Sequence, residues 1–242
     1  YGRAMSRHHL WIAALLASSL TAPGPAGANP GEPSSLESTL LPLVTAQMTK
    51  MGIPGVIVSV QTPGRGAWQA ALGVADIATR APMDVADHVR VGSVTKSLTA
   101  TVILQLAQEG RLHLDDPLAP YSPGVQTNRA TIRQALQLTS GIADYTTDAF
   151  LNALAVVPQR VWSPAELVGL VADEPPMFPA GTDWYYSNTN YVMLGIVAEQ
   201  VTGQPLGRLI SDRIFTPLGM TGCSFPDATD ATVPDPSSRG DM

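Results

Sequence analysis

The sequence predicts an α+β fold, in which a short β-hairpin is followed by a largely helical region. Two apolar segments flank a Pro-Gly-Arg-Gly turn in the first third of the chain, and helical spacing dominates from Thr131 onward. The chain has 242 residues, of which 45% are hydrophobic and 14% are charged, so it can bury a substantial core.

The expected elements follow from the spacing of apolar residues. These residues recur at helical spacing from Ser34 to Met51. The segments Gly55–Thr62 and Ala67–Asp76 flank the turn and form the expected hairpin. A short strand is expected at His88–Val91, before a helix that ends at Gly110. Further helices are expected at about Thr131–Leu138, Pro164–Ala172, Asn190–Val201 and Pro205–Phe215.

Composition excludes several classes of protein. The formal net charge is −6 and the chain has no run of basic residues, which argues against nucleic acid or an anionic membrane surface as a partner. The single cysteine, Cys223, excludes an internal disulfide and a cysteine-based zinc site, and it is expected to be buried. No residue pattern implies a metal or a cofactor, so neither is expected. A monomer is expected.

The N-terminal residues have the layout of a secretory signal. Met5 and Arg7 precede an apolar run of 11 residues, Leu10–Leu20, and the small residues Ala26, Gly27 and Ala28 follow. The run is too short to span a bilayer. Residues 1–28 are therefore expected to be a signal peptide with upstream residues, cleaved near Ala28. Residues 29–242 would then be an exported domain with no membrane span.

One lysine stands out at the start of an apolar helix. The chain has 12 arginines and two lysines, and Lys96 follows Ser93 by three residues, which places both on one helix face. Burial lowers the pKa of a lysine, and a neutral amine can take the proton of a serine hydroxyl. Arginine stays protonated and cannot do this. The pair predicts a serine nucleophile with a lysine base; a surface lysine on the first helical turn is the alternative.

A second candidate motif is Tyr186-Ser187-Asn188, just before the helix expected from Asn190. In an extended turn, Tyr186 and Asn188 project to the same side. A tyrosine there can relay a proton to a leaving group, and an asparagine amide can hold a substrate carbonyl. The alternative is that Ser187 or Asn188 caps the helix, with Tyr186 packed beneath it.

With these two motifs the sequence resembles the serine β-lactamase and penicillin-binding-protein superfamily, whose signature is S-x-x-K, then Y-x-N or S-x-N, then K/H-T-G. The segments "VRVGSVTKSLTA", "LAQEGRLHLDDPL", "LTSGIADY" and "IFTPLGMT" are similar to its branch of secreted D-alanyl-D-alanine carboxypeptidases, class C β-lactamases and related esterases. Leu138 stands where that branch often has histidine. The resemblance, from about Gly55 to Cys223, implies a β-lactamase/transpeptidase-like fold: an antiparallel sheet flanked by helices, plus an all-helical subdomain at about residues 98–225.

The resemblance also implies roles for five residues. Ser93 would be the acylated nucleophile, and its backbone N–H an oxyanion donor. Lys96 would be the base or proton shuttle, and Tyr186 would protonate the leaving amine. Asn188 would bind the substrate's amide, and Phe150 would form an aromatic wall of the acyl pocket.

The implied activity is that of a serine acyl hydrolase working through an acyl-enzyme. A D-Ala-D-Ala carboxypeptidase of cell-wall peptidoglycan that also reacts with β-lactams is favoured over a class C-like β-lactamase or an esterase. The expected substrates are therefore a peptidoglycan stem peptide or a β-lactam.

The sequence departs from the family pattern in one respect. No K-T-G, H-T-G or H-S-G follows Asn188, and the two expected strands are too few for a stable sheet. We therefore expect this chain to lack the C-terminal strands and to be a fragment that cannot complete the site alone. Two other classes stay open: a Ser-His-Asp hydrolase using His88 or His113, and a non-catalytic penicillin- or peptidoglycan-binding protein on the same fold.

Overall fold

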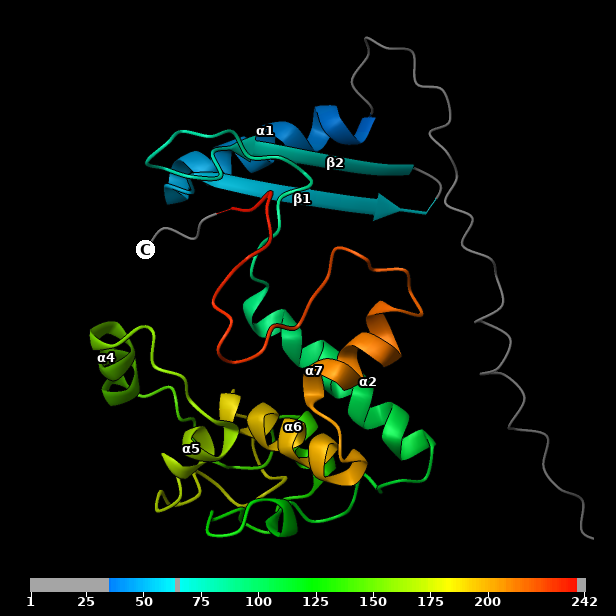
Figure 1. Ribbon diagram of the computed structural model, residues 1–242, viewed down its shortest axis with the longest axis vertical. Coiled ribbons are helices and arrows are strands. Elements are labelled where there is room, and N and C mark those ends of the chain that lie inside the picture. The colour runs from blue at the N-terminus through cyan, green and yellow to red at the C-terminus, as the bar shows by residue number, and fades with distance from the viewer. Residues whose placement is uncertain (1–34, 64–65, 239–242) are drawn as a thin grey trace, which may run out of the picture. The chain divides into compact units, whose positions relative to one another are not determined.

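The computed structural model describes residues 35–63 and 66–238 (Figure 1). The expected signal peptide, residues 1–28, lies outside the described residues. The described residues divide into two compact units, one that ends at Val85 and one that begins at Ala86.

The unit that ends at Val85 contains a helix and a hairpin, as the sequence predicts. Helix α1 (Ser35–Met51) contacts strand β2 (Gly66–Gly73), which pairs in antiparallel fashion with β1 (Gly55–Thr62). Gly55 lies opposite Gly73, and Thr62 lies opposite Gly66. Strand β2 ends three residues earlier than predicted, because Val74 leaves β1 and pairs with Pro82 in an isolated bridge.

The unit that starts at Ala86 is built around two long helices that contact each other, α2 (Thr95–Gln108) and α6 (Asn188–Thr202). Shorter helices surround them: α3 (Ile132–Leu136), α5 (Pro164–Gly169) and α7 (Leu206–Ile210), which continues as a π-helical turn at Ser211–Phe215. Each lies inside a segment where the sequence predicts a helix. Together with the hairpin, they confirm the α+β class.

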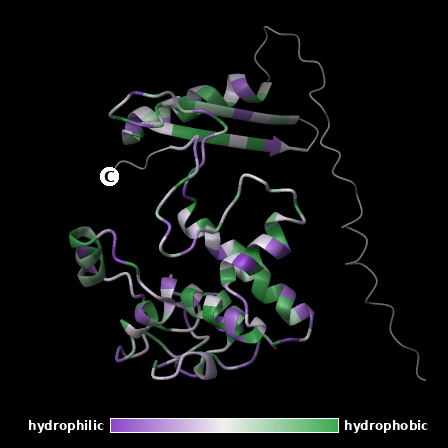
Figure 2. Ribbon diagram, viewed as in Figure 1, coloured by the Kyte–Doolittle hydropathy of each residue, from purple (hydrophilic) through white to green (hydrophobic). Residues whose placement is uncertain are grey.

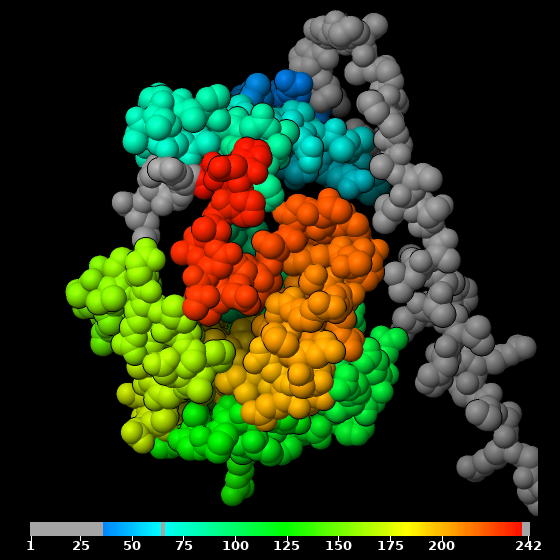
Figure 3. All heavy atoms as spheres, viewed as in Figure 1, coloured from blue at the N-terminus to red at the C-terminus, as the bar shows by residue number. Residues whose placement is uncertain are grey.

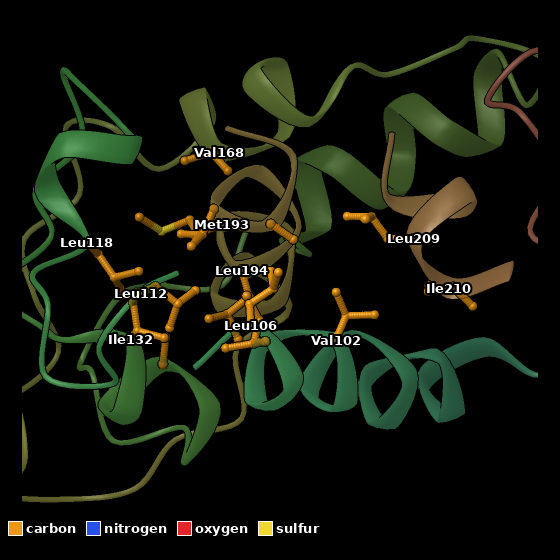
Figure 4. Close-up of a cluster of buried hydrophobic side chains, with 14 of the residues drawn as sticks. Val102, Leu106, Leu112, Leu118, Ile132, Val168, Met193, Leu194, Leu209 and Ile210 are labelled. Carbon is orange, nitrogen blue, oxygen red and sulfur yellow. The ribbon is translucent and has the colours of Figure 1, made fainter. Parts of the chain in front are cut away.

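The core of this unit lies where α2 meets α6 (Figure 4). Val102 and Leu106 of α2, and Met193 and Leu194 of α6, are completely buried. Burying such a side chain stabilises the fold by about 1.5–3 kcal/mol. The apolar residues of α2 are not buried on every side, because Leu104 is 50% exposed.

The ends of the helices explain why they form where they do. Thr131 and Ser163 begin α3 and α5 with capping boxes, in which the side chain accepts a bond from the backbone three residues later. Helix α2 ends before Gly110, whose φ of +71° lets the chain turn away, as predicted. These local bonds satisfy backbone groups that helices leave unpaired at their ends.

Helix α4 (Asp148–Val156) is not predicted by the sequence analysis. Thr147 caps it, and none of its nine residues, all of them described, is buried. It stands apart from the other helices in Figure 1 and is a yellow-green protrusion in Figure 3, although Figure 2 shows it to be largely hydrophobic. Its half-buried residues, Phe150, Ala153 and Leu154, recur at helical spacing, so this helix was predictable from the sequence.

Two further expectations are wrong. The strand expected at His88–Val91 is a single bridge: His88 pairs with Ser237 and the chain is irregular after it. Cys223 is exposed rather than buried, because it lies in the irregular segment that follows the last helical turn. No helix within the described part of the chain has the length and apolar character needed to cross a membrane.

Candidate active site

Ser93 lies in a 3₁₀ turn, Gly92–Val94, that leads directly into α2. Gly92 has a φ of +50°, in the left-handed region that favours glycine, so the backbone reverses immediately before the serine. Ser93 is exposed, whereas Lys96, the second residue of α2, is half-buried. The turn therefore presents the hydroxyl to solvent and directs the lysine inward.

Tyr186 and Asn188 are placed by the start of α6. Ser187 between them is extended, with φ −133° and ψ 120°, and Asn188 begins the helix. The alternative of a simple serine cap does not hold, because the buried Ser187 hydroxyl donates to the Ala143 carbonyl at 3.2 Å instead. The tyrosine is not packed beneath the helix either, because it is 39% exposed.

The structure brings both motifs together around the Ser93 hydroxyl. The Tyr186 hydroxyl donates to Ser93 Oγ at 2.8 Å, and Lys96 Nζ donates to the same oxygen at 3.1 Å. Lys96 Nζ also donates to Asn188 Oδ1 at 2.6 Å. The ammonium group lies 4.8 Å from the centre of the Tyr186 ring and 5.7 Å from that of Tyr191, both within cation–π range. Lys96 is therefore not a surface lysine.

The lysine changes the chemistry of the tyrosine. Its interaction with the Lys96 ammonium, and next its hydrogen bond with Ser93, lower the pKa of the Tyr186 phenol from the usual 10.0. Burial and the charge of Asp144 oppose this shift. By contrast, burial raises the pKa of the neighbouring phenols Tyr145 and Tyr191. A lowered phenol pKa beside a serine hydroxyl is the property expected of a group that exchanges protons with it.

The Asn188 amide is held by two residues that sequence reasoning missed, Asp144 and Thr146. Asn188 Nδ2 donates to Asp144 Oδ2 at 3.1 Å and to Thr146 Oγ1 at 3.2 Å. The Asn188 backbone N–H donates to Asp144 Oδ1 at 3.0 Å. Both residues belong to "LTSGIADYTT", whose first part resembles the family, and that likeness is the signal that pointed to the segment.

The segment that carries Asp144 is fixed from both sides. Gly141 has a φ of +73°, and a Cβ there would lie 2.1 Å from the Phe178 carbonyl oxygen. On the α6 side, the Ser140 hydroxyl donates to Asn190 Oδ1 at 2.8 Å, and Thr189 Oγ1 accepts from the Tyr145 N–H at 3.0 Å. Thr189 and Asn190 are 0% and 1% exposed, so these bonds lie inside the protein.

Phe150 packs against Tyr145, the residue that follows Asp144. Its ring meets that of Tyr145 edge-on, with centroids 5.1 Å apart, and meets Trp162 at 5.2 Å on another side. The structure thus places Phe150 in contact with the rings of Tyr145 and Trp162. Its role as a wall of the acyl pocket stays a prediction.

The hydrogen bonds of the two histidines in the competing hydrolase hypothesis are made to residues other than Ser93. His88 Nδ1 lies 3.0 Å from the Pro236 carbonyl oxygen, and its backbone pairs with residues 236–238. His113 lies in the turn after α2, where its N–H donates to Asp116 Oδ2. In the described residues, no three or more His, Cys, Asp or Glu side chains are grouped to hold a metal ion. The geometry favours the Ser-Lys-Tyr arrangement.

Comparison with known families decides the assignment. The family model described as Beta-lactamase matches residues 42–241. The chain belongs to the β-lactamase family. This confirms the superfamily and the fold that the motifs "SVTK" and "YSN" predict.

Three proteins illustrate what this chain is similar to. A D-aminopeptidase of Brucella anthropi is 33% identical over 168 residues, which are 69% of this chain and 32% of that protein. A D-stereospecific amidohydrolase from Streptomyces sp. is 38% identical, with a TM-score of 0.69 over 77% of this chain and 56% of that one. A D-amino acid amidase from Ochrobactrum anthropi SV3, complexed with D-phenylalanine, is 28% identical, with a TM-score of 0.68 over 80% and 53%. The chain therefore spans about a third to a half of the length of these relatives.

Proposed function

We propose that the protein carrying this chain is a serine hydrolase that cleaves an amide bond through an acyl-enzyme on Ser93. The observation that carries the proposal is the convergence of Tyr186 and Lys96 on one serine oxygen, at 2.8 and 3.1 Å. A nucleophile, two groups able to move its proton and an asparagine that holds one of them form the arrangement that acyl transfer by serine requires.

The geometry defines how the protons move. Because Lys96 and Tyr186 both donate to Ser93 Oγ, one of them must lose its proton before it can take the proton of the serine. The deprotonated group then takes the Ser93 proton while Oγ bonds to the substrate carbonyl carbon. The same proton passes to the leaving amine when the C–N bond breaks. Water then repeats the sequence on the ester, with the serine as the leaving group.

The names of the relatives support a substrate of D configuration. The D-aminopeptidase, the D-stereospecific amidohydrolase and the D-amino acid amidase all share the matched region with this chain. We therefore propose amides or peptides of D-amino acids as the substrate class. The D-Ala-D-Ala carboxypeptidase expected from the sequence is one member of this class and stays a prediction, as does the expected monomer.

The test is a hydrolysis panel with the product of the complete open reading frame. D-phenylalanine amide, L-phenylalanine amide, a D-Ala-D-Ala peptide, a chromogenic cephalosporin and a short-chain ester are compared. We expect faster hydrolysis of D than of L amides, and complete loss of hydrolysis in Ser93→Ala. Ser97→Ala is the control, since Ser97 lies one turn further along α2 and its hydroxyl donates to the Val94 carbonyl.

Three outcomes would contradict the proposal. Activity retained in Ser93→Ala would exclude the nucleophile. Equal rates on the D and L amides would exclude the stereochemical assignment. Covalent labelling of Ser93 by penicillin without turnover of any substrate would favour the non-catalytic binding protein.

A further inference from the structure

The Asn188 side chain has two different ends, and the structure turns each toward a different kind of group. Its Oδ1 accepts from the Lys96 ammonium at 2.6 Å. Its Nδ2 carries two N–H bonds, and the two acceptors within reach are Asp144 Oδ2 and Thr146 Oγ1. The amide therefore links a cation on α2 to a carboxylate on the segment before α4.

Asp144 makes this orientation one-sided. An ionised carboxylate only accepts hydrogen bonds, so the amide must present its NH₂ end to Asp144. A flipped Asn188 would direct its oxygen at the carboxylate and its NH₂ at the ammonium, which is repulsive on both sides. Thr146 reinforces the choice, because its hydroxyl donates to Asp144 Oδ2 and so offers a lone pair to Asn188.

The carboxylate is itself held in place. Asp144 Oδ1 accepts from the backbone N–H groups of Asn188, at 3.0 Å, and Thr146, at 3.3 Å. The residues on either side of Asp144 are bonded to two buried hydroxyls, that of Ser187 just before α6 and that of Thr189 in its first turn. The polar groups around Asn188 are thus fixed before any substrate arrives.

We propose that Asp144 and Thr146 are positioning residues, which lock the Asn188 amide so that its oxygen holds the Lys96 amine at Ser93. The inference rests on the proposed function of the Ser93 site and adds two residues to it. Neither residue touches the serine; both act through Asn188.

Asp144→Asn tests the inference with almost no change in size. Whichever way an asparagine amide at position 144 is turned, its NH₂ meets a donor, either Asn188 Nδ2 or the backbone N–H of Asn188. We expect the rate of acylation to fall about 100-fold, the loss that a misplaced catalytic group commonly causes, with KM changed far less than kcat. Thr146→Val should cost about tenfold, and Thr146→Ser, which restores the hydroxyl, should stay within about twofold of the wild type.

The matched control is Asp148→Asn, which removes the same charge from an exposed position four residues along the chain. We expect it to react like the wild type. A double-mutant cycle then shows whether Asp144 acts through Asn188. In an Asn188→Ala background, Asp144→Asn should reduce the rate by less than about threefold. If the rate loss in the double variant equalled the product of the losses in Asp144→Asn and Asn188→Ala, the inference would be overturned.

A measurement that needs no activity separates this inference from the proposed function. The NMR signals of the Asn188 side-chain NH₂ can be assigned as the pair that disappears in Asn188→Ala. We expect this pair to shift in Asp144→Asn and not in Asp148→Asn. An unshifted pair in Asp144→Asn would overturn the inference, whereas a shifted pair in a protein that hydrolyses no substrate would leave it standing and reject the proposed function alone.

Discussion

The two motifs of the candidate site rest on very different supports. The turn that carries Ser93 has no buried residue among the three that form it, and Val94 next to the serine is 64% exposed. The chain around the start of α6, which carries Tyr186 and Asn188, contains three buried residues. Ser187, Thr189 and Asn190 are 0–1% exposed, and the half-buried Asn188 lies among them. The Ser93 hydroxyl thus lies on an exposed turn, and groups from the buried start of α6 orient it.

This difference indicates that α6, and the segment 140–146 bonded to it, hold the catalytic groups in position. Ser93 Oγ is located by two hydrogen bonds that reach it from Tyr186 and Lys96. Lys96 in turn is located by Asn188. Preorganised polar groups are the main source of catalytic power in many enzymes, because they need no rearrangement during the reaction. Changes on the α6 side should therefore affect the reaction without touching the nucleophile.

The largest loss of activity should come from changing Lys96, which bonds both to Ser93 on the turn and to Asn188 of α6. Lys96→Arg keeps the positive charge but removes the group that can lose a proton, because arginine stays protonated in proteins. We expect the rate of acylation to fall about 1,000-fold, within the range found for general acid–base groups, and thermal stability to change little. The rate is measured by hydrolysis of the best substrate of the panel.

The second lysine supplies the control for this change. Lys50→Arg alters the last turn of α1 in the other unit and should react like the wild type. If Lys96→Arg retained a tenth or more of the wild-type rate, Lys96 would act only as a fixed cation and Tyr186 would be the sole base.

A smaller loss is expected in Tyr186→Phe, which removes one of the two donors to Ser93 Oγ. The phenol pKa is lowered mainly by Lys96, so the tyrosine exchanges its proton at a lower pH than an ordinary phenol. We expect a loss of about 100-fold, measured on the same substrate. An unchanged rate in Tyr186→Phe would leave Lys96 as the only proton carrier.

An ultraviolet titration can check, without substrate, whether Lys96 lowers the pKa of the Tyr186 phenol. Lys96 stabilises the ionised phenol, so Lys96→Met should raise the pKa of Tyr186 and move its ionisation step, followed at 295 nm, to higher pH. Tyr186→Phe identifies the step by removing it. A step that stays in place in Lys96→Met would show that the cation does not act on the tyrosine.

Much of the fold could be predicted because it follows from local rules. Helical spacing locates α1 and α6, and the glycine at position 110 locates the end of α2. The face shared by Ser93 and Lys96 also follows from their separation of three residues. The approach of Tyr186 to Ser93 spans 93 residues, and here the family resemblance alone supplied the expectation.

The features that could not be predicted depend on contacts between residues that lie far apart in the sequence. Asp144 bonds to Asn188 across 44 residues, and the family likeness of its segment does not by itself distinguish it from other turn aspartates. Helix α4 is a different case: Phe150, Ala153 and Leu154 recur at helical spacing, so it could have been predicted although none of its residues is buried. His88 was expected in a strand, but the partner of its single bridge, Ser237, lies 149 residues away.

The smallest expected effects come from one variant in α6 and one in the turn that carries Ser93, and they compare these two regions directly. Thr189→Val keeps the shape of a completely buried side chain but removes the oxygen that accepts the Tyr145 N–H. Leaving this partly buried N–H unpaired should cost about 1 kcal/mol, so the free energy of unfolding, measured with urea, should fall by about that amount. Val94→Thr makes the converse exchange of similar shape on the exposed turn and should change the free energy of unfolding by less than about 0.5 kcal/mol. Because the lost bond borders Asp144, we also expect Thr189→Val to slow acylation by up to about tenfold. Equal stability losses in the two variants would mean that the α6 support is no more rigid than the turn it orients.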